Sequence, residues 1–263
     1  MESTPTNRMA GSLLDRRWLH FAVELVLVVT GILIALAIDG WSEDREQRRS
    51  EQAYLELLAR DLGQIESQLQ QQIEFETSMA NTAVAAYDLI NDNDPARHSN
   101  QIGKMLVAVS VRRTLFLDSA AYTDLISTGN LGLITDRELR DRITRYFSDV
   151  ERRELIVEKN NRVFVDEMLL AFLFEHGVSY HLWKDSPVGA TMSFDSINNS
   201  FSPAMREPMD KVLSLPRDAP EWARVKQLLS WRAMVAVVAR DSAASILSAT
   251  VELRKDLEAH LAQ

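Results

Sequence analysis

The chain has 263 residues, 46% hydrophobic and 25% charged, which is enough to fold around a sizeable core and too apolar for a disordered chain. The chain has a formal net charge of −9 and no long run of Lys and Arg, which nucleic-acid binding requires, so we expect no nucleic-acid partner. The absence of cysteine excludes disulfides, cysteine-ligated zinc, iron–sulfur clusters and thiol catalysis. With only 9 glycines and 7 prolines, the composition favours an all-α fold over a β-sandwich with many turns.

An apolar stretch near the N-terminus predicts a transmembrane helix over residues 18–41, after a short leader of residues 1–17. Trp18 and Trp41 bracket the stretch, as expected for aromatic side chains at the two membrane interfaces. A helix of this length spans ~35 Å, close to the thickness of a hydrocarbon core with its inner interfaces. The 13 Leu, Ile, Val and Phe residues between the tryptophans favour insertion by about 4 to 8 kcal/mol. We therefore expect the lipid bilayer to be a partner of the chain.

Two other interpretations of this stretch stay open. It could be a buried core helix of a soluble protein, although runs this long and apolar are typical of lipid contact. It could also be a cleaved signal peptide, with Arg16 and Arg17 before the apolar run and a small-x-small site at residues 35–37. Glu24 within the charged leader region, and the continuation of the run to Trp41, argue against cleavage.

Polar and small residues inside the predicted span are candidate sites for a partner or for self-association. Glu24 and Asp39 are ionisable, and His20 lies one helical turn before Glu24 on the same face. Gly31 and Ala35 form a small-xxx-small pair, which permits two helices to approach closely. The alternative is that Glu24 lies near the headgroups and is reached by water, and that the small pair occurs by chance.

The orientation of the span is weakly encoded, because arginines occur on both sides. Arg8, Arg16 and Arg17 precede it, and Arg45, Arg48, Arg49 and Arg60 follow it. We favour a cytoplasmic N-terminus, since the short leader carries its basic residues directly against the membrane, and long domains translocate largely regardless of charge. The C-terminal domain is then periplasmic.

Residues 42–263 are predicted to form one helical domain that begins with a long helix, or two consecutive helices, over 43–90. Apolar residues step along it by three and four positions, as in a coiled-coil seam: Leu55, Leu58, Leu62, Ile65 and Leu69. We expect this stripe to pack within its own domain, with a coiled coil as the alternative. A turn at 91–95 ends the helix at Pro95.

Shorter helices follow over 98–112 and 118–127, the second with Asp118 or Ser119 as its N-cap. Gly129 suits the left-handed residue that ends a helix. Thr135, with Glu138 three residues later, predicts a capping box for a helix from 136 to about 176.

Two stretches in this part of the chain and in the span resemble the signature of a bacterial family. Residues 24–43 read ELVLVVTGILIALAIDGWSE, and residues 121–134 read AYTDLISTGNLGLI. The second stretch supplies the six positions Tyr122, Leu125, Ser127, Gly129, Leu131 and Ile134. Together they are similar to a family of uncharacterised bacterial single-pass membrane proteins. The resemblance implies a bacterial inner-membrane location, one N-terminal span and a helical domain, and it implies no established activity.

Residues 178–220 hold five of the seven prolines and are predicted to form an irregular insertion in the helical bundle. Helix returns over 221–260, with one apolar side formed by Leu228, Val235, Ala239, Ile246, Leu253 and Leu257. Arg232, Arg240 and Asp241 in its middle argue against a second span.

No residue pattern in the chain indicates an active site. His176 and His181 do not have the spacing of a known zinc signature, and no phosphate-binding loop or nucleophile elbow is present. We expect no cofactor, no metal and no catalytic activity. The first hypothesis is a membrane-anchored helical interaction protein that binds an unidentified membrane protein or a second copy of itself. A sensor-like ligand-binding bundle is the alternative, and an enzyme of unrecognised type is the third.

Overall fold

The structure, a computed structural model, describes residues 10–92, 95–176, 178, 213 and 215–262. Every regular element among these residues is helical, which confirms the all-α prediction. The chain divides into two compact units, residues 1–54 and residues 55–263, which are described separately below. This division reflects contacts within the chain. The predicted boundary at residues 41 and 42 reflects a membrane surface, and it stays a prediction.

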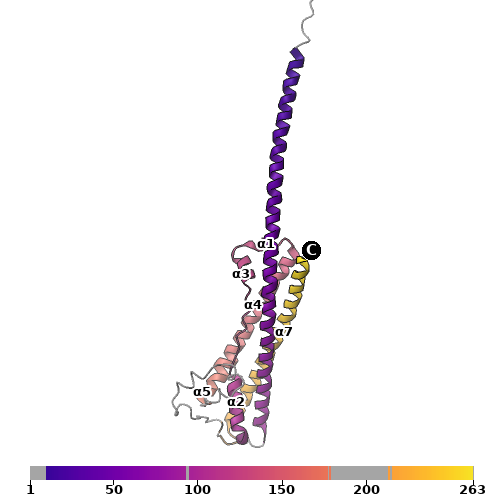
Figure 1. Ribbon diagram of the computed structural model, residues 1–263. Coiled ribbons are helices and arrows are strands. Elements are labelled where there is room, and N and C mark those ends of the chain that lie inside the picture. Colours follow the sequence, from indigo (N-terminus) through magenta and orange to yellow (C-terminus); the bar gives the residue numbers. More distant parts are fainter. Residues whose placement is uncertain (1–9, 93–94, 177, 179–212, 214, 263) are drawn as a thin grey trace, which may run out of the picture. The chain divides into compact units, whose positions relative to one another are not determined.

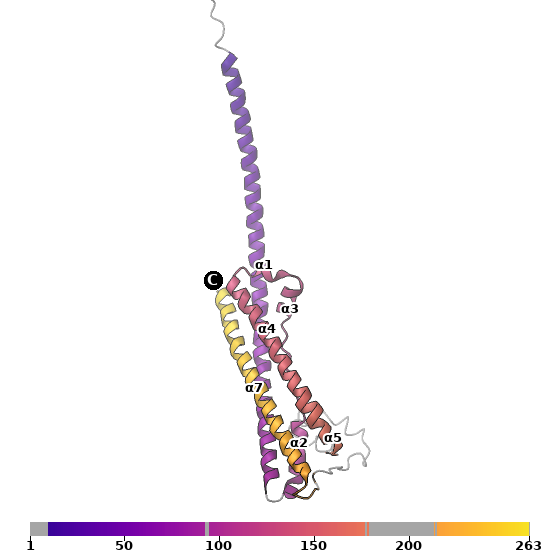
Figure 2. The ribbon, with the colours of Figure 1, turned by 180° about the vertical axis from the view of Figure 1, so that it is seen from behind.

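Figures 1 and 2 show the helices in the order of the sequence. Their bounds are α1 Ala10–Asn91, the 3-10 helix η1 Pro95–His98, α2 Ser99–Val109, α3 Ala120–Ser127, the 3-10 helix η2 Asn130–Leu133, α4 Arg137–Asn160, the π-helix η3 Asn161–Leu170, α5 Ala171–Glu175 and α7 Pro220–Leu261. The predicted helix over 136–176 is therefore α4, η3 and α5 in direct succession. The predicted insertion lies almost wholly outside the described residues.

Within residues 1–54, the stretch of α1 from Val23 to Ile38 is apolar on all sides apart from Glu24 and Thr30. The large apolar side chains from Val23 to Ile38 are 45% to 69% exposed. The 18-residue window that gives α1 the length and composition of a membrane span has a mean hydropathy of 2.3, and none of it is buried within the chain. The apolar side chains of this segment are thus left for lipid or for another protein to cover.

Within residues 55–263, α4 and α7 lie side by side (Figures 1 and 2). The rest of α1 packs on α7 through shared core residues and through the ion pair of Glu66 with Arg254. All five residues of the predicted α1 stripe, from Leu55 to Leu69, are at most 1% exposed. The six predicted core residues of α7 are buried as well. A second core cluster joins α1, α2, η3, α5 and α7 around Ala83, Leu106, Leu169 and Leu229. The α1 stripe therefore packs within its own domain, as predicted.

The α7 helix also has the length and composition of a possible span, with a mean hydropathy of 1.4 over its apolar window. It differs from α1 because 33% of that window is buried inside the domain. Its Arg232 is fully buried.

The ends of the short helices follow local sequence signals, with one correction. Ser119 is the N-cap of α3 and its Oγ accepts a hydrogen bond from the Tyr122 amide, as predicted. Gly129 adopts the left-handed conformation, with φ of 72°. The predicted Thr135 capping box of α4 is wrong. Asp136 is the N-cap, and its Oδ1 accepts hydrogen bonds from the amides of Glu138, at 2.8 Å, and Leu139, at 3.1 Å. A carboxylate at this position also complements the positive end of the helix dipole.

Candidate functional site

The candidate residues of the predicted span lie on an exposed helix. Trp18 and His20 belong to α1, but their side chains lie outside what the structure describes. The side chains of Glu24, Asp39 and the interfacial Trp41 are exposed to the surroundings of the helix. Two carboxylates on an otherwise apolar surface are costly in lipid unless they reach the interface or a partner neutralises them.

The small pair in the span leaves a shallow face on α1. Ala35 is exposed, and a Cβ added to Gly31 would meet no heavy atom within 4 Å. Glycine at this position therefore has no packing reason within the described chain. Such a face permits close approach of a second helix.

The residues that carry the family resemblance at 121–134 form a folded corner between α3 and α4. Tyr122 stacks on Phe147 of α4, with ring centroids 3.9 Å apart. Leu125 and Ile134 are fully buried, Leu131 is half-buried, and Ser127 Oγ donates to the Asp124 carbonyl at 3.2 Å. These positions stabilise the corner, and none of them is presented as a chemical group for a ligand.

Asp61 of α1 holds this corner against the first helix. One of its carboxylate oxygens, Oδ2, accepts a hydrogen bond from Ser119 Oγ at 2.8 Å and another from the Ala121 amide at 3.1 Å. The contacts join residues about 60 positions apart, so the segment before α3 is fixed by tertiary structure. Sequence periodicity gave no signal for this contact, because Asp61 lies outside the apolar stripe of α1.

A charged pair lies in the core of the bundle, between α1 and α7. Arg232 donates from Nη1 to Glu76 Oε2 at 3.4 Å, from Nε to the Val109 carbonyl at 2.8 Å and from Nη2 to the Val111 carbonyl at 3.3 Å. Gln72 Nε2 donates to Glu76 Oε1 at 3.0 Å. Both members of the ion pair are fully buried.

Burial sets the protonation chemistry of this pair. It raises the pKa of the Glu76 carboxyl, and the Arg232 cation opposes that effect. Burial likewise lowers the pKa of Arg232, and Glu76 opposes it. A guanidinium remains charged in proteins, so Arg232 and Glu76 form a buried salt bridge. Neither side chain is exposed, and we assign the pair a structural role.

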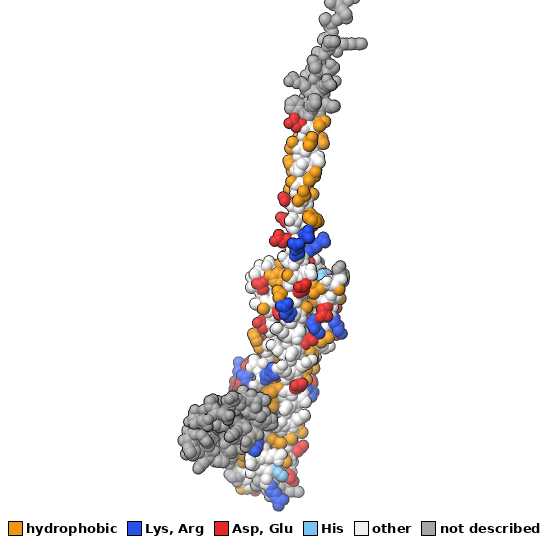
Figure 3. All heavy atoms as spheres, viewed as in Figure 1, with side chains coloured by type: hydrophobic (Ala, Val, Ile, Leu, Met, Phe, Trp, Pro, Cys, Tyr) orange, Lys and Arg blue, Asp and Glu red, His pale blue; other side chains and the backbone are white. Residues whose placement is uncertain are grey.

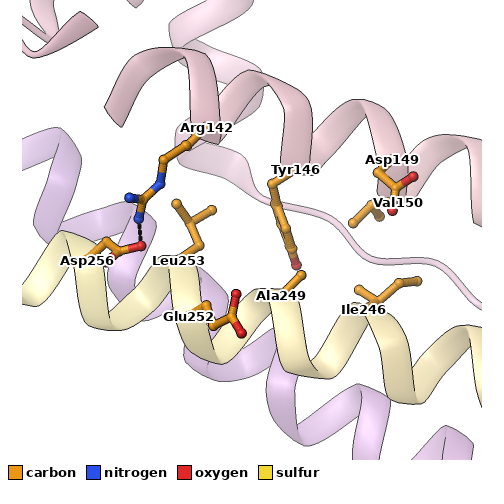
Figure 4. Close-up of a pocket in the computed structure, with 9 residues that line it drawn as sticks. All are labelled: Arg142, Tyr146, Asp149, Val150, Ile246, Ala249, Glu252, Leu253 and Asp256. Carbon is orange, nitrogen blue, oxygen red and sulfur yellow. Dashed lines mark ion pairs between the residues drawn. The ribbon is translucent and has the colours of Figure 1, made fainter. Parts of the chain in front are cut away.

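A groove of about 400 Å³ runs between α4 and α7 (Figure 4). Its lining combines an apolar floor with charged edges: Arg142, Tyr146, Asp149, Val150, Ile246, Ala249, Glu252, Leu253 and Asp256. Arg142 and Asp256 form an ion pair across it, drawn as a dashed line in Figure 4. Asp149 accepts from Arg152 and Arg153, which lowers the pKa of its carboxyl.

Tyr146 extends from α4 toward α7 at the centre of the groove (Figure 4). Its hydroxyl lies 2.8 Å from Thr250 Oγ1, and burial raises the pKa of Tyr146 to about 12. A phenol with that pKa stays protonated and is a poor general base at neutral pH. Because two of the three carboxylates are already ion-paired, the groove presents no pair of groups poised for acid–base chemistry.

No group of three or more His, Asp or Glu side chains that could hold a metal ion occurs among the described residues. His176 belongs to the end of the α5 segment, where its Nδ1 lies 2.9 Å from the Phe172 carbonyl. His181 and Asp185, which the sequence places near it, lie outside the described residues.

Comparison of the chain with curated proteins and with solved structures finds no match. A family model matches residues 24–167, and its family is described as one of unknown function. The matched range takes in the apolar segment after Val23, the buried α1 stripe, the corner between α3 and α4, and α4 itself. Since the match covers more than half of the 263 residues, the chain belongs to the family of unknown function DUF6090.

Proposed function

We propose that this chain is a single-pass membrane protein, anchored by the N-terminal part of α1, that works without catalysis by binding another membrane protein. The observation that carries the proposal is the exposure of the apolar side chains from Val23 to Ile38. Contiguous apolar surface of this kind is unfavourable in water and marks contact with lipid or with a partner. The helical domain then acts as a scaffold or subunit of an inner-membrane assembly.

One span, and not two, is the arrangement that the packing of α7 supports. Crossing the membrane would require α7 to leave the core that it shares with α1 and α4. Its buried Arg232 would lose Glu76 and the Val109 carbonyl as partners. A charge transferred alone into a bilayer costs several kcal/mol. We therefore keep α7 within the water-soluble domain.

Partner binding through the span is supported by groups that lipid alone satisfies poorly. Glu24 is an exposed carboxyl on an apolar helix, and Gly31 with Ala35 provides a face for close helix contact. A basic or hydrogen-bonding group on a second helix would satisfy Glu24. We further propose that the N-terminus is cytoplasmic and the domain periplasmic, from the arginines that directly precede the span in the sequence.

The test is co-purification of partners from the native membrane with the detergent-solubilised chain, comparing the wild type with Glu24→Gln. Glu74→Gln, which neutralises an exposed carboxylate of α1 within the bundle, is the matched control. We expect a specific co-purifying membrane protein that Glu24→Gln loses and Glu74→Gln retains. An identical set of partners for all three proteins would remove the span carboxylate from the proposal.

A further inference from the structure

A stripe of one aromatic and three basic side chains follows the apolar segment on a single face of α1. Trp41, Arg45 and Arg49 are spaced by four residues, so they lie one above another along the helix, and Arg48 lies beside them, three residues after Arg45 and seven after Trp41. Asp39 and Glu43 lie on the opposite face, whereas Asp44 flanks the stripe on the side of Arg48 and Glu46 flanks it on the side of Arg49. Figure 3 shows blue side chains gathered directly after the orange stretch, with red ones toward the other flank.

The Arg45 side chain turns back toward the apolar end of the helix. Its guanidinium carbon lies over the Trp41 ring, 5.5 Å from the ring centroid, in a cation–π contact. By the rise of a helix, Trp41 lies ~4.5 Å beyond Ile38, whereas the Arg45 backbone lies ~10 Å beyond it. The contact therefore brings the Arg45 charge back to the level of the tryptophan.

These three arginines have charge available for an external anion. Among the residues that the structure describes, no carboxylate lies within ion-pair distance of Arg45, Arg48 or Arg49. A shallow hollow runs along the stripe, lined by Trp41, Ser42, Arg45, Glu46, Arg49, Ser50 and Ala53. The lining contributes two guanidiniums and two hydroxyls, which are donors suited to phosphate oxygens, and one carboxylate, that of Glu46.

We propose that the stripe Trp41–Arg45–Arg49, with Arg48 beside it, binds the phosphate of an anionic phospholipid headgroup. The inference rests on the proposed function, since it requires residues 18–41 to span the bilayer. Trp41 then lies at the headgroup level, and the headgroup region begins just beyond the hydrocarbon core. Arginine stems reach along the helix to place their charges there. The cation–π contact holds Arg45 in this orientation before lipid binds.

Lipid is the favoured source of the phosphate because the basic stripe begins within one turn of the aromatic anchor. Clusters of basic residues directly beside a span are typical of contacts with anionic headgroups. On a helix that spans the bilayer every face meets the headgroup layer, so we expect the phosphate at the stripe and not beside Asp39 or Glu43 on the opposite face. A soluble phosphate compound offers the same chemistry, and the test separates the two sources.

The experiment uses the full chain reconstituted in nanodiscs of equal parts phosphatidylglycerol and phosphatidylcholine. Mass spectrometry then measures the ratio of the two lipids that stay bound after mild detergent extraction. We expect enrichment of phosphatidylglycerol in the wild type, and a fall of about fivefold or more in that enrichment for Arg45→Gln/Arg49→Gln. The control Arg137→Gln/Arg217→Gln removes the same charge from exposed positions outside residues 1–54 and should keep the wild-type ratio.

Three outcomes would contradict the proposal, each at a different step. Equal lipid ratios for the wild type and the Arg45→Gln/Arg49→Gln variant, with both chains inserted, overturn the lipid site and leave the span intact. Release of the chains from the nanodiscs by alkaline carbonate overturns the proposed function itself. Absence of phosphatidylglycerol enrichment in the wild type, together with binding of inorganic phosphate that the Arg45→Gln/Arg49→Gln variant loses, assigns the stripe to a soluble phosphate and overturns lipid as its ligand.

Discussion

One helix, α1, contains two stretches of apolar residues that the chain treats in opposite ways. From Val23 to Ile38 the large apolar side chains are 45% to 69% exposed, whereas Leu55, Leu58, Leu62, Ile65 and Leu69 are at most 1% exposed. The first stretch is apolar on every face, and the second is apolar on one face only. Both stretches are rich in leucine and both are helical. What distinguishes the exposed stretch from the one buried in the bundle is how many faces of the helix carry apolar residues.

The same contrast applies to charge. Glu24 lies on the exposed apolar stretch, whereas Glu76 is buried in the bundle against Arg232 and Gln72. The bundle supplies a partner for its buried carboxylate from within the chain. The proposed span has to obtain one from water, lipid headgroups or another protein.

The largest effect is expected from placing charge at the centre of the apolar stretch. Each arginine there costs about 2.5 to 3.5 kcal/mol and removes an apolar contribution, so Ile32→Arg/Leu33→Arg offsets most of the ~4 to 8 kcal/mol that favours insertion. We expect this variant to be extracted from membranes by alkaline carbonate. Val84→Arg/Met234→Arg, at exposed apolar positions of the bundle, should stay in the membrane pellet. Retention of both variants would mean that the apolar stretch is not the anchor.

The next effect comes from separating the buried ion pair. Arg232→Met leaves the Glu76 carboxylate buried with only Gln72 as a partner, which should destabilise the bundle by about 3 to 5 kcal/mol. The double variant Glu76→Gln/Arg232→Met removes both charges and should recover much of that loss. Urea denaturation of the detergent-solubilised proteins, followed by circular dichroism, measures both. Equal stability of the single and double variants would show that Glu76 does not depend on the guanidinium.

A matched pair of leucine truncations tests the two stretches of α1 directly. Leu62→Ala removes a side chain that is 0% exposed, and it should cost about 2 to 5 kcal/mol of bundle stability. Leu33→Ala removes one that is 61% exposed, and its effect on the same unfolding transition should be under ~0.5 kcal/mol. A comparable loss for Leu33→Ala would contradict the separation of the two environments.

Much of the fold could be predicted because its signals are local or periodic. The α1 stripe, the six core positions of α7, the Ser119 cap and the left-handed Gly129 are all present in the structure. Each depends on a spacing of three and four residues or on the preference of one residue type for one conformation. No partner elsewhere in the chain has to be known for these predictions.

Other features escaped prediction because tertiary contacts decide them. Thr135 and Asp136 are both good N-caps, and the choice between them depends on which residue leaves the helical conformation. Arg232 and Glu76 are 156 positions apart, so their pairing has no signal in either helix alone. One signal was available: Arg232 lies in phase with the buried residues Leu228 and Val235.

The π-helical segment η3 also left a trace in the sequence. Up to the end of η3 the buried residues of this stretch are Val157, Asn161, Val165 and Leu169, and in α5 both Phe172 and Leu173 are buried. From Val157 to Leu169 they repeat every four positions, without the steps of three that an α-helical stripe requires, and the step of three returns between Leu169 and Phe172 of α5. Phe164 of this segment stacks on Trp231 of α7, with centroids 4.7 Å apart. A π-helix has more residues per turn than an α-helix, so residues four positions apart in η3 stay on the face that packs on α7.

The smallest effect is expected at Tyr146, whose hydroxyl is bonded to Thr250 inside the bundle. Tyr146→Phe should cost about 0.5 to 1.5 kcal/mol at neutral pH, because Thr250 keeps its hydrogen bond to the Ile246 carbonyl. The folded-state pKa of Tyr146 is raised from 10.0 to about 12. Stability that depends on the protonated phenol is therefore complete below pH 10 and is lost as the pH rises toward 12.

The Phe variant lacks that alkaline loss, so its stability deficit relative to the wild type should shrink, or change sign, between pH 10 and pH 12. Urea denaturation of both proteins across this range measures the difference, and the titration of other groups cancels in it. A deficit that stays constant with pH would mean that Tyr146 titrates alike in the folded and unfolded chains. The α1 stretch from Val23 to Ile38 contains no tyrosine. The change in stability between pH 10 and pH 12 therefore depends on the bundle and is independent of the proposed anchor.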